Sequence, residues 1–227
     1  MSAAEPLLEA RGLYRFFHIG DDETAALHGV ELRLRPGEFV AVMGPSGSGK
    51  STLLACLTGL DEPDAGAVTV AGRRLTRRPE AERARLRARH FGILRQSGNL
   101  FPQLSVRQNI ALQRRLAGVR GGAASAPIDA LLERVALAHR GDDYPASLSG
   151  GETARAALAV ALAADPAVLI ADEPTAEVDR DTEDRLLDTL AAHCAAGRAV
   201  LVATHSAELA RRADRIVRLR DGGLTDV

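Results

Sequence analysis

The chain has 227 residues, of which 46% are hydrophobic, so it can bury a sizeable core as one compact unit with lobes. Its formal net charge of −1 at pH 7 excludes a global positive field that would attract nucleic acid or an anionic membrane surface. The first twelve residues lack a basic segment followed by an apolar one, and Asp165 and Pro166 interrupt the longest apolar stretch, at 156–171. These patterns argue against a signal peptide and a membrane span, and they predict a soluble, cytoplasmic polypeptide.

Short extended runs with turn residues between them occupy the first part of the chain. Pro36 and Gly37 form a turn between two of these runs, and one further run follows a glycine-rich loop. The runs are 7–13, 30–34, 38–43 and 67–70. Together they predict a small antiparallel β lobe made of about residues 1–43 and 66–76.

An arginine-dense segment follows, from Gly72 to Arg89, with Glu80 and Glu82 among the arginines. Eight arginines in such a segment could contact nucleic acid. However, no aromatic residues are interleaved, and arginine replaces lysine almost everywhere in this chain. We therefore predict a solvated helix and no nucleic-acid partner.

The middle of the chain has helical periodicity. Apolar residues recur at helical spacing over 105–116, where Ser105 and Gln108 match a capping box. A small-residue linker at 118–126 and a second helix at about 128–138 complete a predicted helical lobe at about 97–150. Afterwards helices and strands alternate: a helix from 149, a strand at 168–171, a helix at 182–195 and a strand at 199–203. This alternation predicts an α/β fold with a mostly parallel core sheet covered by helices.

Lys50 is the only lysine among 29 basic side chains, and it lies in a glycine-rich loop between an apolar run and a helix start. The loop matches G-x-x-x-x-G-K-[ST], in which backbone N–H groups surround phosphates, the lysine reaches the outer two, and the serine hydroxyl of Ser51 ligates Mg²⁺. A compact ammonium on a flexible stem suits this task better than a guanidinium. The predicted nucleotide-binding residues are Gly44, Pro45, Ser46, Gly47, Ser48, Gly49, Lys50, Ser51 and Thr52.

Two adjacent carboxylates, Asp172 and Glu173, end the apolar run at 168–171. The carboxyl ends of strands are where α/β sheets bind ligands. We expect Asp172 to hold Mg²⁺, directly or through water, and Glu173 to act as the general base for an attacking water. An ordinary acidic turn is the alternative, and the nearby phosphate loop argues against it.

Five further residues narrow the family: Leu148, Ser149, Gly150, Gly151 and Glu152. With these motifs in this order, essentially the whole chain resembles the ATPases of ABC transporters, whose signature is LSGGQ. The resemblance implies a single ABC-type P-loop NTPase domain over 1–227 that binds ATP and Mg²⁺ and hydrolyses ATP. The parts outside the β lobe and the helical lobe would form the nucleotide-binding core.

The same resemblance implies roles for four further residues. Phe17 looks like the aromatic residue that stacks on adenine, with Tyr14 as a rival. Gln96 looks like the glutamine that senses Mg²⁺ and the attacking water, and it therefore counts as both a catalytic and a metal residue. Residues 176–179 look like the loop called the D-loop, which ends at Asp179, and His205 looks like the histidine that contacts the γ-phosphate.

The signature also implies a second subunit. Ser149 and the N–H groups of Gly150 and Gly151 would form a helix N-terminus with roughly half a positive charge, which suits an anion. In this family a second chain supplies that site, so two ATP molecules lie between two chains. The sequence leaves a homodimer and a heterodimer equally open.

Within the family, the chain resembles the branch that serves macrolide export, lipoprotein release and cell division. The features are its short length, Leu100-Phe101-Pro102 after Gln96, and Tyr144-Pro145 before the signature. This branch implies a transmembrane permease partner, a place at the cytoplasmic face of the membrane, and export or mechanotransmission. Leu100, Phe101 and Leu104 would either dock the permease or fill the helical lobe. An alternative function is an ATP-gated regulatory or cell-division signalling module with little transport.

The chain departs from the family pattern at the last residue of the signature. Glu152 stands where the family has glutamine, which adds a carboxylate near the partner's γ-phosphate, where like charges repel. We therefore expect slower turnover or a preference for a non-identical partner. Cys56 and Cys194 have no metal-ligand neighbours at the usual spacing, so we expect buried thiols without a redox or metal role.

Overall fold

A six-stranded sheet forms the centre of the structure, a computed structural model that describes residues 5–19, 22–119, 127–176 and 178–226. Its strands are in the order β10-β9-β3-β8-β7-β6, and β9, β3, β8, β7 and β6 pair in parallel, whereas β10 pairs antiparallel to β9. The bounds are β3 Phe39–Met43, β6 Phe91–Leu94, β7 Val168–Asp172, β8 Ala199–Thr204, β9 Arg215–Arg220 and β10 Gly223–Asp226. The predicted mostly parallel core sheet is confirmed.

The central strands are apolar on both faces, and each face packs on a different layer. Val168 and Ile170 of β7 pack on the side of the second sheet and of α1, whereas Leu169 and Ala171 pack on the side of α5 and α6. The bounds are α1 Lys50–Leu57, α5 Gly150–Leu162 and α6 Arg180–Ala195. A short helix, α7 Ala207–Arg211, follows β8. Burial on both faces explains the continuous apolar runs of these strands.

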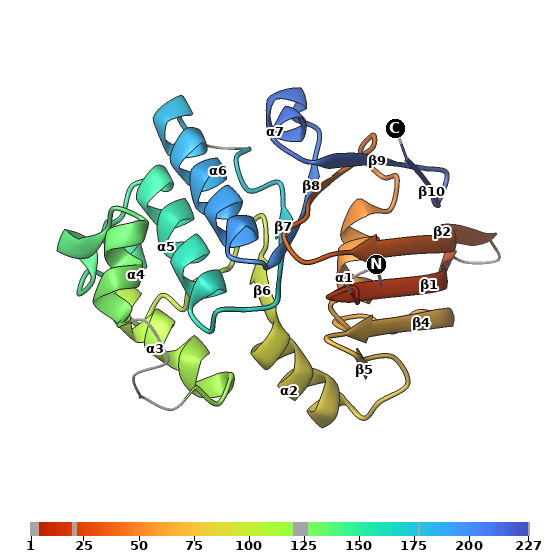
Figure 1. Ribbon diagram of the computed structural model, residues 1–227, viewed down its shortest axis with the longest axis horizontal. Helices are drawn as coiled ribbons and strands as arrows, with labels where there is room; N and C mark the ends of the chain where they lie inside the picture. Colours follow the sequence, from red (N-terminus) through yellow and green to blue (C-terminus); the bar gives the residue numbers. More distant parts are fainter. Residues whose placement is uncertain (1–4, 20–21, 120–126, 177, 227) are drawn as a thin grey trace.

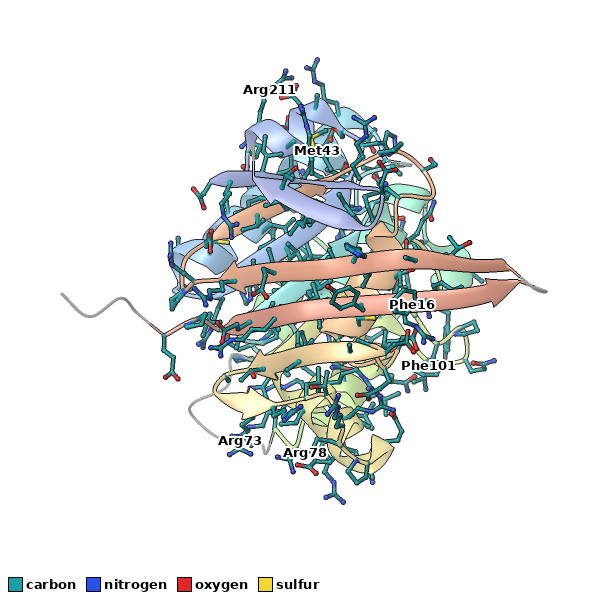
Figure 2. The ribbon with its side chains drawn as sticks, turned by 90° about the vertical axis from the view of Figure 1, so that its right-hand side faces the viewer. Phe16, Met43, Arg73, Arg78, Phe101 and Arg211 are labelled. Atoms are coloured by element: carbon teal, nitrogen blue, oxygen red, sulfur yellow. The ribbon has the colours of Figure 1, made fainter. Side chains whose placement is uncertain are left out.

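A second, four-stranded sheet has the order β2-β1-β4-β5, and its neighbouring strands pair antiparallel. Its strands are β1 Leu8–Ile19, β2 Asp22–Leu34, β4 Ala65–Val70 and β5 Arg73–Arg74. Figure 1 shows this sheet on the right of the molecule with α1 between it and the central sheet, and Figure 2 looks onto it, with Phe16 labelled on β1. The leucines of α1 share one hydrophobic cluster with both sheets.

One expectation about this sheet is wrong: the run at 38–43 does not belong to the antiparallel lobe. Residues 39–43 form β3, which pairs in parallel with β8 and β9. A strand with one solvated face alternates in burial, whereas the first four residues of β3 are all buried. The turn at Pro36 and Gly37 carries the chain from one sheet to the other, and the Gly37 N–H donates to the carbonyl of Arg198 beside β8 at 2.9 Å.

Helices α3 Val106–Leu116 and α4 Ile128–Arg134 pack with α5 around a hydrophobic cluster of their own, on the left in Figure 1. The predicted capping box of α3 is confirmed, because the Ser105 hydroxyl accepts from the Gln108 N–H and the Gln108 side chain accepts from the Ser105 N–H. Helix α4 is shorter than predicted because Ala136 adopts a φ of 56°, which ends a right-handed helix. Two short 3₁₀ helices follow, η1 Ala138–Arg140 and η2 Pro145–Ser147. Part of the predicted linker, at 120–126, lies outside the described residues.

The arginine-dense segment contains helix α2, Glu80–His90, in which Leu86 alone is buried, as expected for a solvated helix. The guanidinium groups of Arg83 and Arg87 have partners within the protein. Both pair with Glu80, and the Arg87 guanidinium also donates to the carbonyl of Gly59 at 2.7 Å. Figure 2 labels Arg73 and Arg78, which lie just before this helix. Among the described residues, no helix has both the length and the apolar composition needed to cross a membrane.

The two cysteines are buried and free, as predicted. Burial raises the pKa of the Cys56 thiol to about 12 and that of the Cys194 thiol to about 11. Such thiols stay protonated, and a protonated thiol is a poor nucleophile and a poor metal ligand.

His193 on α6 gives the stability a testable pH dependence. Its ring is buried with Nε2 3.1 Å from the carbonyl oxygen of Pro166, and burial lowers its pKa to about 4. In the unfolded chain this imidazole is protonated below about pH 6.5, whereas in the folded chain it stays neutral down to about pH 4. The stability that is present above pH 6.5 is therefore lost as the pH falls toward 4. We expect this histidine to remove about 2 kcal/mol of unfolding free energy between pH 7 and pH 4.5.

Urea unfolding at these two pH values checks the expectation. His193→Gln should lose less stability on acidification than the parent, and the exposed His139→Gln is the control for removing a histidine. An equal pH dependence in parent and His193→Gln would show that another group is responsible.

Candidate functional site

A pocket of about 1050 Å³ opens where β3 and β7 end and α1 begins. Parallel strands bring their carboxyl ends to the same edge of a sheet, which is why segments far apart in sequence meet here. The antiparallel sheet and the turn between β9 and β10 close the other side. The lining residues are Phe17, 24–26, 45–52, Gln96, Asp172, Glu173 and 220–222.

The glycine-rich loop passes close to both sheets. Gly49, which precedes α1, has a φ of 98°, and a Cβ atom there would lie 2.4 Å from the carbonyl oxygen of Ala26 in β2. A Cβ on Gly44 would lie 2.5 Å from the carbonyl oxygen of Leu219 in β9. Only glycine allows both the left-handed backbone at position 49 and these close approaches.

The loop offers polar groups that suit phosphates. Helix α1 begins without a side-chain cap and without an acidic residue in its first turn, so its first N–H groups remain available to an anion. The Ser48 hydroxyl is buried and, among the described residues, has no hydrogen-bond partner. The Lys50 ammonium donates to the carbonyls of Gly44 at 2.7 Å and of Pro45 at 3.1 Å. These donors and this cation fit a polyphosphate.

Hard oxygen ligands for a divalent cation stand beside the loop. The Ser51 hydroxyl donates to the Asp172 carboxylate at 2.8 Å, so two of the three side chains proposed from the sequence for Mg²⁺ meet. Gln96 lines the same pocket. Within the described residues there is no cluster of three or more His, Cys, Asp or Glu suited to a metal. The hydroxyl of Ser51, the carboxylate of Asp172 and the side-chain amide of Gln96 are oxygen ligands of the kind that Mg²⁺ takes.

Glu173 is held firmly at the pocket. Its backbone has a φ of 47°, which is strained for a residue with a side chain, and its N–H donates to the carbonyl of Ala203 in β8 at 2.9 Å. Its carboxylate accepts from the Thr204 hydroxyl at 3.1 Å and lies 2.8 Å from the Nδ1 atom of His205. The Glu173 side chain is 15% exposed, whereas that of His205 is 75% exposed. The carboxylate is thus fixed, and the imidazole extends into solvent.

The two aromatic candidates for a base contact lie in different places. Phe17 lines the pocket and is 40% exposed. Tyr14 is not among the lining residues; its ring stacks on Phe16 with centroids 6.2 Å apart and meets the His28 ring edge-on at 5.2 Å. The geometry therefore favours Phe17, the residue preferred from the sequence.

The signature residues lie outside this pocket, at the N-terminus of α5. Ser149 and Glu152 form a capping box, with the Ser149 N–H donating to the Glu152 carboxylate at 2.8 Å. A Cβ atom on Gly151 would lie 2.8 Å from the Thr182 hydroxyl and 3.3 Å from the Asp179 carboxylate. The structure thus brings the signature and Asp179 together, whereas Glu177 in the same loop lies outside the described residues. Leu148, at the start of the signature, packs against the cluster of the helical lobe.

Sequence reasoning missed a partner of Glu152. The Arg140 guanidinium of η1 lies 3.1 Å from the Glu152 carboxylate and 2.9 Å from that of Asp143. The Ser149 N–H, the Ser149 hydroxyl and then Arg140 hold the pKa of Glu152 below its usual value. No pattern in the sequence pointed to Arg140, because its η1 segment is short and irregular.

A second, apolar groove of about 430 Å³ lies between α2 and α3. Leu60, Phe101 and Leu116 line it, and each is more than half exposed. Buried Asn109, also missed from the sequence, fixes the neighbouring loop: its side chain accepts from the Phe101 N–H at 2.8 Å and donates to the Leu104 carbonyl at 3.0 Å.

The structure places the residues of the 100–104 segment in different surroundings. Phe101 lines the groove, whereas Leu100 packs against the cluster of the helical lobe. Leu104 is half-buried and is not among the lining residues of the groove.

Comparison with known proteins finds a matching family model and several relatives of this chain. Residues 27–176 match the protein-family model described as ABC transporter. The chain is similar to the lipoprotein-releasing system ATP-binding protein LolD of Ruegeria pomeroyi, with 42% identity over 224 residues that cover 98% of each protein. It is also similar to the macrolide export ATP-binding/permease protein MacB 1 of Aeromonas hydrophila, with 40% identity over 220 residues that cover 97% of this chain and 34% of that protein.

Among solved structures, the fold is similar to the ATP-binding cassette MJ0796, a dimer in a post-hydrolysis state bound to ADP and Pi. The TM-score is 0.88 with 32% sequence identity, and the match covers 97% of each chain.

Gly49 and Gly47 make a matched pair for testing the loop. Both have a positive φ, but a Cβ on Gly47 meets nothing within 4 Å, whereas one on Gly49 collides with the Ala26 carbonyl. We expect Gly47→Ala to lower stability by about 1 kcal/mol, the cost of the left-handed backbone alone, and Gly49→Ala to cost more. Thermal unfolding measures both, and equal losses would show that the loop moves away from β2 without penalty.

Proposed function

The chain belongs to the ABC transporter family, and on that premise we propose that it is the ATP-hydrolysing subunit of a transporter, dimerising around two ATP molecules and driving a membrane permease. One observation carries the proposal. The phosphate loop and the carboxylates of Asp172 and Glu173 share one pocket, whereas the signature helix start lies outside it on the same chain. A single chain thus holds two different halves of an ATP site.

In this proposal residues 44–52 bind the phosphates of ATP, and Phe17 stacks on the adenine. The Lys50 ammonium would exchange the carbonyls it now contacts for phosphate oxygens. Ser51, Asp172 and Gln96 would hold Mg²⁺, which supplies positive charge beside the phosphates when bound.

Hydrolysis would use Glu173 as general base. A water oxygen attacks the γ-phosphorus, its proton passes to the Glu173 carboxylate, and ADP leaves. The Thr204 hydroxyl at 3.1 Å and His205 Nδ1 at 2.8 Å orient that carboxylate, and the exposed imidazole of His205 is available to the γ-phosphate. Gln96 would help to place the water.

A second ABC ATPase subunit, identical or not, would supply the signature to each ATP. The residues Leu148, Ser149, Gly150, Gly151 and Glu152 stand at the start of α5, where helix N–H groups attract anions. Asp179, against Gly151, would lie at the same interface. The dimeric state of the related cassette MJ0796 supports this arrangement.

The permease would dock in the apolar groove beside α2 and α3, with Phe101 as its main contact, while Leu100 packs on the cluster of the helical lobe. Exposed apolar side chains around a groove suit a partner helix. The name of the relative MacB 1 combines ATP-binding and permease parts in one protein. The chain would therefore be peripheral at the cytoplasmic face of the membrane and serve export or mechanotransmission. A regulatory or cell-division signalling module remains the alternative, and low ATP turnover in the presence of the permease would favour it.

The first test of ATP-dependent dimerisation is the size of the Glu173→Gln protein, measured by light scattering with and without ATP and Mg²⁺. Removing the general base should leave ATP bound but unhydrolysed, so we expect a monomer without ATP and a dimer with it. Lys50→Ala in the same background should stay monomeric because it loses the phosphate contact. A persistent monomer in Glu173→Gln would mean that a different subunit or the permease completes the site.

The carboxylate at position 152 gives a second test. If it repels the partner's γ-phosphate, Glu152→Gln should raise ATP turnover roughly twofold to fivefold, the range of an exposed charge interaction. Arg140→Gln should lower turnover, because the carboxylate then loses its counter-charge. Unchanged turnover and dimerisation in both variants would show that this charge has no influence on the partner.

A further inference from the structure

The Phe17 ring, proposed above as the adenine contact, has a cation over one of its faces. The guanidinium carbon of Arg15 lies 4.9 Å from the centroid of the ring. This distance is within the range of a cation–π interaction. An aromatic ring has two faces, so the cation occupies one and leaves the other for a flat ligand.

Carboxylates hold Arg15 in this position. Its Nε and Nη2 atoms donate to the two oxygens of Asp61 at 2.9 and 3.1 Å, which is a bidentate pair. Its Nη1 atom donates to Asp64 at 3.3 Å. The Arg15 side chain is only 22% exposed, so its orientation is fixed rather than free in solvent.

The same carboxylates are anchored to two other elements. Asp64 accepts from the Phe16 N–H at 2.8 Å, which ties it to β1 beside Phe17. Asp61 lies in the turn after α1, and its N–H donates to the carbonyl of Ala55 in the last turn of that helix at 3.1 Å. The network therefore connects the aromatic ring with the helix whose other end begins at Lys50.

We propose that Arg15 is a positioning residue for nucleotide binding: clamped by Asp61 and Asp64, it fixes the Phe17 ring so that the opposite face accepts the base while α1 receives the phosphates. The proposal rests on the function proposed above. Phe17 is 40% exposed, so its ring would otherwise lose rotational freedom when a base stacks on it. A ring that is already held gives up less freedom on binding.

Binding of ADP and of inorganic pyrophosphate, measured by titration calorimetry with Mg²⁺, tests this assignment. Pyrophosphate uses the phosphate loop alone, whereas ADP also uses the base contact. We expect Arg15→Gln to weaken ADP binding roughly threefold to tenfold, as the loss of a partly desolvated cation–π contact predicts, and to leave pyrophosphate binding unchanged. Arg15→Lys should keep part of the ADP affinity, because an ammonium retains the charge but not the bidentate pair.

Two further variants separate the possible outcomes. Phe17→Ala should weaken ADP binding on its own, and adding Arg15→Gln to it should cause no further loss. Arg33→Gln removes an arginine that is also paired with a carboxylate, that of Glu9 on β1, but this pair lies at the opposite end of β1 from Phe17, so the variant should change neither affinity.

Unchanged ADP affinity in Arg15→Gln, or equal losses of ADP and pyrophosphate, would overturn the role of Arg15 and leave the proposed ATPase function intact. If Phe17→Ala bound ADP like the parent, the base contact and with it the role of Arg15 would both be wrong. Failure of the parent protein to bind either ligand would instead contradict the proposed function itself.

Discussion

The parallel pairing of β3, β8 and β7 is the constraint on which the rest of the structure depends. Met43 lies opposite Thr204, and Asp172 lies opposite Ala203, so the three strands end within about one residue of the same level. The residues that follow them, Gly44, Glu173 and His205, must therefore emerge side by side. The hydrogen bonds from Thr204 and Ser51 to the two carboxylates are consequences of this register.

The antiparallel sheet forms the other side of the pocket, because its strand β2 passes close to the glycine-rich loop. A Cβ on Gly49 would have no room beside Ala26, so β2 and the start of α1 are effectively in contact. Such contact brings Phe17 of β1 and Lys50 to the lining of the same pocket. The distance between the proposed base contact and the proposed phosphate contact therefore depends on backbone packing between the two sheets.

Features that are contained in a short stretch of sequence could be predicted from it. Contacts between residues that are far apart in the sequence could not. The phosphate loop, the pair at 172–173 and the capping box at 105–108 are each contained within a few residues. Arg15 and Asp61 are 46 positions apart, and Arg140 reaches Glu152 from an irregular segment, so neither pair leaves a periodic pattern. The strand at 39–43 was assigned to the wrong sheet for a related reason. An apolar run after a turn indicates that a strand is present, but it does not show with which other strands that strand pairs.

Several charged groups lie close together at the start of α5. A helix N-terminus carries roughly half a positive charge, and Glu152 in its first turn adds a full negative one. Without Arg140, the local balance would be negative and unsuited to an ATP phosphate. Arg140 lies 3.1 Å from Glu152 and offsets its charge, but the same guanidinium also pairs with Asp143, so the local balance stays slightly negative. The capping hydrogen bonds and the arginine therefore reduce, without removing, the repulsion between Glu152 and the phosphate proposed to bind here.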